Sequence, residues 1–379
     1  MKVTDYQASE AGRVIQTPEG YAAFVPSPPQ TDFDYSADIV LALSRADTVL
    51  SELSGLGRAL PNPHLLIAPY VRREAVLSSR IEGTEADLSD LFMDEAVAAQ
   101  EPVPAGDVRE VRNYVTALEY GLGRLPTLPL SLRLVRELHE RLMHGVRGDY
   151  ATPGEFRCSQ NWIGAPGSTP TDAVYVPPPP IEMQAALDAW EKFLHHRGTM
   201  PDLLQCALMH ENFEAIHPFL DGNGRIGRLL ITLFLMERGR LSQPLLYISD
   251  YIEAHRAEYY AALQRIRTHG DWPQWFLYFL AAVEQSANKA LVQARLLLDL
   301  REELRAQFVE QPRVAALVDI LFANPYTTIK RAAGALGVSP PTAGKAIRAL
   351  AAAEVVEEIT GQSWGRVFVA RPILEAIRR

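Results

Sequence analysis

Two apolar helical patterns with a short polar loop between them dominate the middle of this 379-residue chain. In the first pattern, Cys206, Met209, Phe213 and Ile216 recur at spacings of 3, 4 and 3 residues, which is the period of one helix face. The loop that follows reads HPFLDGNGR, and a second apolar run begins where it ends. The spacing therefore predicts a helix on each side of the loop, with a cluster of polar side chains held between two buried elements.

Composition places the chain among folded proteins without a broad nucleic-acid surface. Apolar residues make up 47% and charged residues 22%, values that exclude disorder. The formal charge of −9 excludes a generally basic surface. Apolar runs fall short of the roughly 20 residues that a membrane span needs, and the first residues lack the apolar core of a secretory signal. Two cysteines exclude a disulfide framework. We therefore expect a cytoplasmic protein without membrane contact.

Helical periodicity along most of the chain predicts a mainly α fold. Residues 1–34 carry repeated prolines and predict an irregular arm, and residues 35–110 predict an N-terminal helical region. Residues 111–310 predict a helical core. Within it, 156–176 holds two short extended runs around Gly and Pro, which predict a β-hairpin flap.

The last segment, 311–379, predicts a separate domain. Its pattern gives a helix, then two helices separated by a turn at Gly337, then an alternating stretch with a Gly-containing turn. This order resembles a winged helix-turn-helix domain. Nine Lys or Arg against five Asp or Glu in 313–379 make this end basic within an acidic protein.

The loop from His217 to Arg228 concentrates residue types that suit phosphate chemistry. Gly222 and Gly224 allow close backbone approach to a ligand, and the helix start after them suits an anion. Arg225 and Arg228 lie at i and i+3, where both guanidiniums reach the same polyphosphate. Asp221 is an oxygen ligand suited to Mg²⁺, and His217 can accept a proton at neutral pH. No Gly-Lys-Ser/Thr follows the glycines, which excludes a Walker loop.

The same loop resembles the motif of the Fic family, HxFx(D/E)GNGRxxR, at every specified position. Members of this family transfer AMP from ATP to a hydroxyl side chain of a target protein. The resemblance implies a Mg²⁺-dependent protein adenylyltransferase with His217 as general base and Asp221 as the metal ligand. It also implies an ATP site that extends from the α- and β-phosphates to the γ-phosphate. The residues of this site are Gly222, Asn223, Gly224, Arg225, Ile226, Gly227 and Arg228. Ile226 and Gly227 fall at unspecified motif positions.

A second match lies upstream of the motif. Residues 78–83 read SSRIEG and resemble the family's inhibitory pattern, (S/T)xxxE(G/N), with Ser78 and Glu82 at the specified positions. The resemblance implies that Glu82 pairs with Arg228 and occupies the guanidinium that should hold the γ-phosphate of ATP. We therefore expect an enzyme that inhibits itself.

The resemblance also implies sites around the motif and leaves several questions open. Residues 156–176 would dock the target protein as an added strand, with auto-modification as one outcome. Tyr260 or Tyr259 would lie beside the nucleoside. The transferred group, a reverse reaction that removes AMP and a homodimer stay open. A third hypothesis is a regulator whose function lies in the C-terminal domain, which would contact DNA or a protein through Lys345, Arg348 and Arg366.

Overall fold

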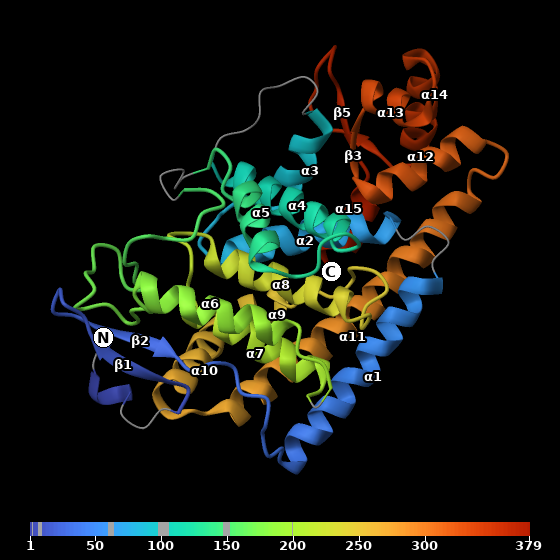
Figure 1. The fold of residues 1–379 in the computed structure, drawn as a ribbon. Coiled ribbons are helices and arrows are strands. Elements are labelled where there is room, and N and C mark those ends of the chain that lie inside the picture. Colours follow the sequence, from blue (N-terminus) through green and yellow to red (C-terminus); the bar gives the residue numbers. More distant parts are fainter. Residues whose placement is uncertain (2, 7–9, 60–63, 98–105, 147–151, 199) are drawn as a thin grey trace.

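The computed structural model describes residues 1, 3–6, 10–59, 64–97, 106–146, 152–198 and 200–379, and helices predominate in it (Figure 1). This agrees with the mainly α fold that periodicity predicts. The helices before the C-terminal domain are α1 (Ala37–Ala59), α2 (His64–Ile81), α3 (Leu88–Val97), α4 (Asp107–Arg124), α5 (Leu132–Leu142), α6 (Pro180–Leu194), α7 (Asp202–Ile216), α8 (Asn223–Glu237), α9 (Ser249–Ala254), α10 (Arg256–His269) and α11 (Trp272–Ala306). Within the described part of the chain, no helix combines the length and apolarity that crossing a membrane requires.

Helices α7 and α8 form the centre of the core. Every residue of α7 after its first is buried, and α8 is buried from Ile226 to Leu235. They pack against each other, with α6 and α11 on α7 and α4 and α5 on α8. The loop between them, residues 217–222, is therefore fixed at both ends by the most buried elements of the chain.

Helix α2 lies beside this core and ends where the predicted inhibitory pattern lies. It packs against α4, α9 and a helix near the C-terminus, α12 (Pro312–Ala323), and also contacts α8. The helix stops at Ile81, and Gly83 has a φ of 96°, a left-handed conformation that favours glycine. Glu82 is therefore the first residue after α2, and its position depends on how α2 is packed.

The N-terminal arm is more regular than the prediction of an irregular segment. It contains a short 3-10 helix, η1 (Val3–Tyr6), and an antiparallel hairpin of β1 (Gly12–Gln16) and β2 (Ala22–Pro26). The apolar runs on either side of a Pro-Glu-Gly turn explain the pairing, which the repeated prolines obscured. Through Phe24, whose N–H donates to the carbonyl of Val176 at 2.9 Å, the hairpin lies against the flap.

The flap at 156–176 differs from the expected two-stranded hairpin. Its two runs meet in a single antiparallel bridge between Ile163 and Tyr175, and no strand is assigned in this part of the described chain. Gly and Pro residues in the tip, residues 164–170, interrupt the ladder beyond the bridge.

The segment that the sequence predicts as a separate domain is called the C-terminal domain below. It contains α12 (Pro312–Ala323), β3 (Tyr326–Thr328), α13 (Ile329–Leu336), α14 (Pro340–Ala352), β4 (Glu357–Glu358), β5 (Val367–Val369) and α15 (Arg371–Arg378). The three strands form one sheet in the order β3-β5-β4. Gly337, with a φ of 64°, ends α13 as the sequence indicates. Sequence reasoning missed β3 and α15, which are only 3 and 8 residues long.

Candidate functional site

His217 is held in an unusual backbone conformation directly after α7. Its φ of 49° and ψ of 60° lie in the left-handed region that residues other than glycine rarely adopt. The His217 carbonyl accepts hydrogen bonds from Arg157 Nε at 2.9 Å and from Asn161 Nδ2 at 3.3 Å. These contacts from the flap fix the conformation and aim the imidazole.

The His217 imidazole is neutral and has a defined tautomer. Burial lowers its pKa to about 4, and the nearby positive charges of Arg157 and Arg267 add to the effect. Nδ1 lies 3.3 Å from the Glu214 carbonyl, which can only accept, so Nδ1 carries the proton. Nε2 is then free to act as a base.

The loop after His217 is closed by its own side chains. Asn223 Oδ1 accepts from the Phe219 N–H, and Asn223 Nδ2 donates to the Phe219 carbonyl, both at 2.8 Å. Gly222 has a φ of 77° and precedes the first residue of α8. The turn therefore ends in a helix N-terminus that no side chain caps.

This helix N-terminus is a cradle for an anion. The N–H groups of Asn223, Gly224 and Arg225 lie in the first turn of α8 and have no intrahelical acceptor. The helix dipole adds partial positive charge at the same place. A phosphate group placed here would meet three backbone donors.

Asp221 lies at the open side of the cradle. Its side chain is 48% exposed, and its Oδ1 accepts from the Gly222 N–H at 2.6 Å and lies 3.7 Å from Arg225 Nη2. The carboxylate therefore faces the same opening as the N–H groups of the first turn.

Arg225 has a partner that the sequence does not reveal. Its side chain is 4% exposed, and Nη1 donates to Glu110 Oε2 on α4 at 3.0 Å. The guanidinium therefore belongs to a buried ion pair at the edge of the cradle.

Arg228 is bound by the end of α2. Its Nε donates to Ser78 Oγ at 2.9 Å, and Nη2 donates to the Ser78 carbonyl at 2.9 Å and to Glu82 Oε1 at 2.7 Å. Burial would raise the pKa of Glu82, but the Arg228 guanidinium outweighs that effect and lowers it. The pairing expected of Glu82 and Arg228 is present as one short contact, with Ser78 taking the other donors.

Ile226 and Gly227 turn away from the cradle. The Ile226 side chain is fully buried in the core, and its N–H donates to the Gly222 carbonyl. The Cβ position of Gly227 faces Glu214 and His210 behind the helix. The place of Ile226 and Gly227 in the ATP site remains a prediction from the family motif.

The two tyrosines of α10 have different surroundings. Tyr259 is buried, and its hydroxyl lies 2.8 Å from His210 Nε2. Tyr260 is 43% exposed, with the Arg256 guanidinium 5.8 Å from its ring centre. Of the two, Tyr260 alone has a ring surface open to a ligand.

Three residues that shape the loop were missed by sequence reasoning. His139 stacks on Phe219 at 3.7 Å between ring centres and contacts the Asp221 carbonyl through Nε2 at 3.0 Å. Arg157 is buried and Asn161 donates to the Phe219 carbonyl at 2.7 Å. The last two lie within the flap segment, and position 139 gives no local signal because its contacts are distant in sequence.

The basic residues singled out in the C-terminal domain are exposed. Lys345 and Arg348 lie on the outer face of α14, and Arg366 precedes β5. Exposed Glu357 and Glu358 occupy β4, which pairs with β5 in the same small sheet.

Solved structures with this fold are found among Fic proteins. A crystal structure of a Fic family protein from Desulfovibrio desulfuricans matches 91% of this chain and 98% of its own, at 20% identity and a TM-score of 0.57. The Fic-1 protein of Caenorhabditis elegans matches 68% of this chain and 74% of its own, also at 20% identity, with a TM-score of 0.50. At this identity the likeness concerns the fold.

Sequence comparisons point the same way. Proteins named protein adenylyltransferase Fic from Drosophila erecta and Drosophila virilis are 33% and 34% identical to this chain over 114 residues, which are 30% of this chain and 21% of theirs. The chain thus spans about a fifth of the length of these relatives. A sequence model described as Fic/DOC family N-terminal matches residues 40–123, and one described as Fic/DOC family matches residues 129–235. Together they span just over half of the chain and include every motif residue from His217 to Arg228, and the chain belongs to the Fic/DOC family.

Proposed function

We propose that this protein transfers AMP from ATP to a hydroxyl group of a target protein and that Glu82 restrains the reaction. One observation carries the proposal: a neutral histidine, an uncapped helix N-terminus and Arg228 surround the same loop, and a carboxylate pairs with Arg228. The names of the Drosophila relatives, which describe adenylyl transfer, support the same reaction.

In the proposed reaction His217 acts as the general base. The target hydroxyl gives its proton to His217 Nε2, and its oxygen attacks the α-phosphorus of ATP. The new O–P bond forms while the bond between the α-phosphorus and the bridging oxygen breaks, and pyrophosphate leaves. The N–H groups of Asn223, Gly224 and Arg225 would stabilise charge on the phosphate oxygens.

The surroundings of Asp221 fit a magnesium ion. The carboxylate is half-exposed at the mouth of the cradle, and Mg²⁺ in nucleotide sites takes one or two carboxylates with phosphate oxygens and water. When bound, Mg²⁺ would neutralise charge on the phosphates.

Restraint by Glu82 would act through Arg228. The guanidinium is 1% exposed, and its contacts to Ser78 leave Nη2 directed at Glu82. A γ-phosphate that seeks the same guanidinium competes with a carboxylate already bound within the same chain. ATP then binds without the alignment that in-line attack needs.

The target would dock at the flap. Trp162 and Ile163 are exposed there at 41% and 38%, and Arg157 and Asn161 tie the flap directly to His217. Residues of this chain itself are further acceptors, so auto-modification provides an assay without a known target. Exposed Lys345 and Arg348 on α14 support a separate partner contact, and a salt-dependent gel shift with the full chain tests whether that partner is DNA.

The proposal is tested with ATP labelled at either the α or the γ phosphate, incubated with Mg²⁺ and wild-type, Glu82→Gly or His217→Ala protein. We expect protein-bound label from the α position only, stronger in Glu82→Gly and absent in His217→Ala. Glu85→Gly is the matched control, because Glu85 is exposed and close in sequence but does not contact Arg228. Equal labelling of all four proteins, or label from the γ position, contradicts the proposal.

A further inference from the structure

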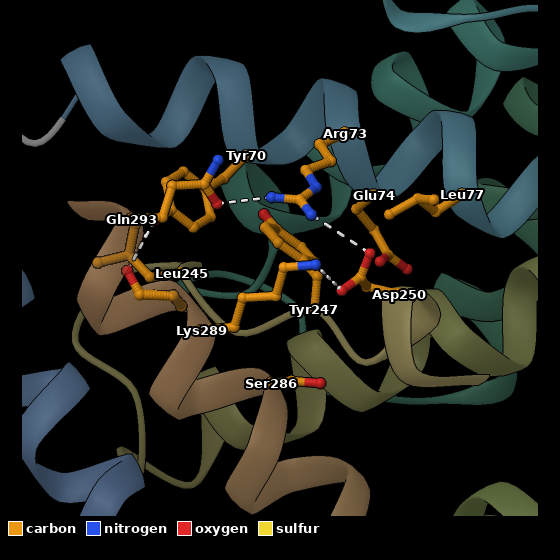
Figure 2. A pocket seen from close by; sticks show the side chains of 11 residues that line it. Tyr70, Arg73, Glu74, Leu77, Leu245, Tyr247, Asp250, Ser286, Lys289 and Gln293 are labelled. Carbon is orange, nitrogen blue, oxygen red and sulfur yellow. Dashed lines mark hydrogen bonds and ion pairs between the residues drawn. The ribbon is translucent and has the colours of Figure 1, made fainter. Parts of the chain in front are cut away.

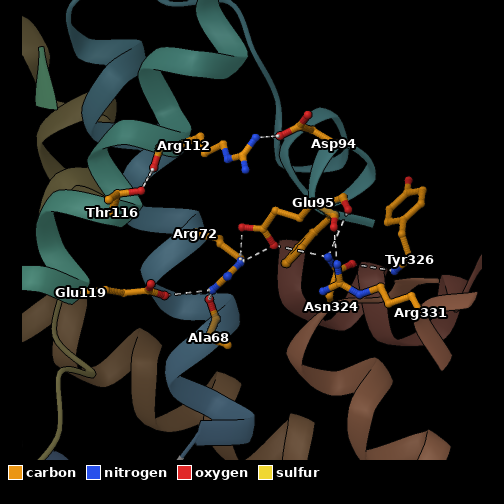
Figure 3. A network of polar contacts seen from close by, with 11 residues as sticks. Ala68, Arg72, Asp94, Glu95, Arg112, Thr116, Glu119, Asn324, Tyr326 and Arg331 are labelled. Atoms are coloured by element: carbon orange, nitrogen blue, oxygen red, sulfur yellow. Dashed lines mark hydrogen bonds and ion pairs between the residues drawn. The ribbon is translucent and has the colours of Figure 1, made fainter. Parts of the chain in front are cut away.

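The C-terminal domain is joined to the middle of α2 by two separate chains of polar contacts. They begin at Arg72 and Arg73, consecutive residues whose side chains run along different flanks of the helix (Figures 2 and 3). Each arginine reaches the C-terminal domain through one intermediate side chain. Neither contact is needed to build the loop at His217.

The first chain runs through Glu95 on α3. Arg72 Nε contacts both carboxylate oxygens of Glu95, at 2.9 and 2.8 Å (Figure 3). Asn324, the residue after α12, donates through Nδ2 to the same carboxylate at 3.3 Å and to the Phe92 carbonyl at 3.1 Å. Arg331 of α13 donates to the Glu95 carbonyl. Asn324 is 4% exposed, and the Arg72 and Glu95 side chains are 15% and 14% exposed, so this contact is largely shielded from water.

The second chain runs through Gln293 on α11. Arg73 Nη1 donates to Gln293 Oε1 at 2.7 Å, and Arg73 Nη2 contacts Asp250 at 3.3 Å (Figure 2). Gln293 Nε2 donates to the carbonyls of Ile377 at 2.6 Å and Ala376 at 3.3 Å, in α15. Gln293 is 5% exposed, and every polar atom of its amide is used.

A third contact lies just beyond Glu82. Arg378 of α15 donates to Ser89 Oγ at 2.6 Å and to Asp87 Oδ2 at 3.1 Å, in the segment that leads from α2 into α3. The C-terminal domain therefore holds the polypeptide on both sides of Glu82. Helix α12 also packs directly against α2.

The position of α2 decides where the Glu82 carboxylate lies. Glu82 follows the last residue of the helix, and Arg72 lies ten positions earlier, about 15 Å along a helix axis. A helix transmits a shift or rotation from one end to the other because its hydrogen bonds keep it rigid over this length. Weakening the contacts of Arg72 and Arg73 therefore makes α2 more mobile and weakens the ion pair between Glu82 and Arg228.

We propose that the C-terminal domain is a regulatory clamp that keeps α2 in its inhibitory position, so that displacing this domain releases the active site. The inference rests on the proposed function for its activity readout. It assigns the polar contacts of Asn324 and Gln293 a role in restraint, and these residues act through α2 as positioning residues.

The test compares wild type with the double substitution Gln293→Ala/Asn324→Ala in the full chain with Glu82 present. We expect auto-modification to rise about tenfold, because each substitution removes buried hydrogen bonds to a charged partner. The same double substitution in a Glu82→Gly background should change the rate less than about twofold, since no carboxylate remains to displace. Amide hydrogen exchange of residues 70–83 should become faster in the double variant.

Asp319→Ala is the matched control. Asp319 pairs with Arg301 and Arg305 of α11, so its substitution removes ion pairs of α12 that do not reach α2 and leaves the two chains to α2 in place. Equal effects of Asp319→Ala and the double variant, or unchanged exchange of residues 70–83, would overturn the clamp. If no protein is labelled, Glu82→Gly included, the proposed transfer reaction fails, and hydrogen exchange still decides whether the domain holds α2.

Discussion

The Glu82 carboxylate occupies the space that a side chain on Gly224 would fill. A Cβ at residue 224 would lie 2.3 Å from Glu82 Oε1 and 2.9 Å from Arg228 Nη1. The bare backbone that allows a phosphate to approach the start of α8 also allows the inhibitory carboxylate to do so. The same glycine therefore serves both the proposed substrate and the group that excludes it.

Gly224→Ala should separate these two uses of the glycine. In a Glu82→Gly background the clash with the carboxylate is absent, and the added methyl instead covers N–H groups that would hold a phosphate. We expect kcat/KM for ATP to fall about tenfold or more. Gly123→Ala is the control, since its Cβ would meet no atom within 4 Å. An unchanged kcat/KM would show that the backbone at 224 does not contact the nucleotide.

Features that depend on neighbouring residues could be predicted from the sequence, and those that depend on distant residues could not. The helix, loop and helix around His217 follow from local periodicity and the glycines, and the end of α2 follows from Gly83. Glu110, which pairs with Arg225, lies 115 positions away from it, and no pattern marks that partner. The fold brings the two together because α4 packs on α8.

The N-terminal hairpin and the flap illustrate the same limit. Repeated prolines in residues 1–34 favoured an irregular segment, but β1 and β2 pair there, and β2 hydrogen-bonds to Val176 of the flap. In the flap itself, two short extended runs predicted a β-hairpin, but glycine and proline at the tip leave one bridge between Ile163 and Tyr175. Whether a short extended run becomes a strand depends on which surface it meets, and that information is not local.

The pH dependence of the reaction should reflect a base that is neutral over the physiological range. Burial and positive neighbours lower the pKa of His217 to about 4, so the active neutral form prevails above that pH. In the Glu82→Gly variant, ionisation of His217 should leave kcat/KM for the transfer unchanged between about pH 5 and 8. As pH drops toward 4, protonation of His217 should lower kcat/KM. An NMR titration of the histidine side chains checks the assignment. A His217 midpoint near 6.5 would contradict it.

Glu74 should make the folded state less stable as pH rises. Burial raises the pKa of this carboxyl from 4.5 to about 7, although Ser249 and Tyr114 donate to it at 2.5 and 3.1 Å. Between these two values the folded state binds more protons than the unfolded state, so the free energy of unfolding decreases with increasing pH. In wild type, Glu74 should lower the free energy of unfolding by at most about 3 kcal/mol between pH 5 and 8. Glu74→Gln should abolish this contribution.

Urea unfolding of wild type and Glu74→Gln at pH 5 and pH 8 measures this difference. Burial also raises the pKa values of Glu211 and Glu214 to about 7, so a decrease of stability with pH should persist in the variant and be smaller than in wild type. Identical pH dependence in the two proteins would mean that Glu74 ionises in the folded state as it does in the unfolded chain.

Gly227 should be required for packing, although its motif position is unspecified. A Cβ there would lie 2.5 Å from Glu214 Oε1 and 3.3 Å from the His210 ring, and both groups are buried on α7. We expect Gly227→Ala to lower the free energy of unfolding by about 1–3 kcal/mol, as overpacking in a core does. Gly123→Ala, at an open position of α4, should instead be neutral or slightly stabilising, because alanine favours a helix. Combining Gly227→Ala with Glu214→Ala removes the closest clash, so the cost of the alanine should shrink in that background. An equal cost with and without Glu214 would place the constraint elsewhere than between these two helices.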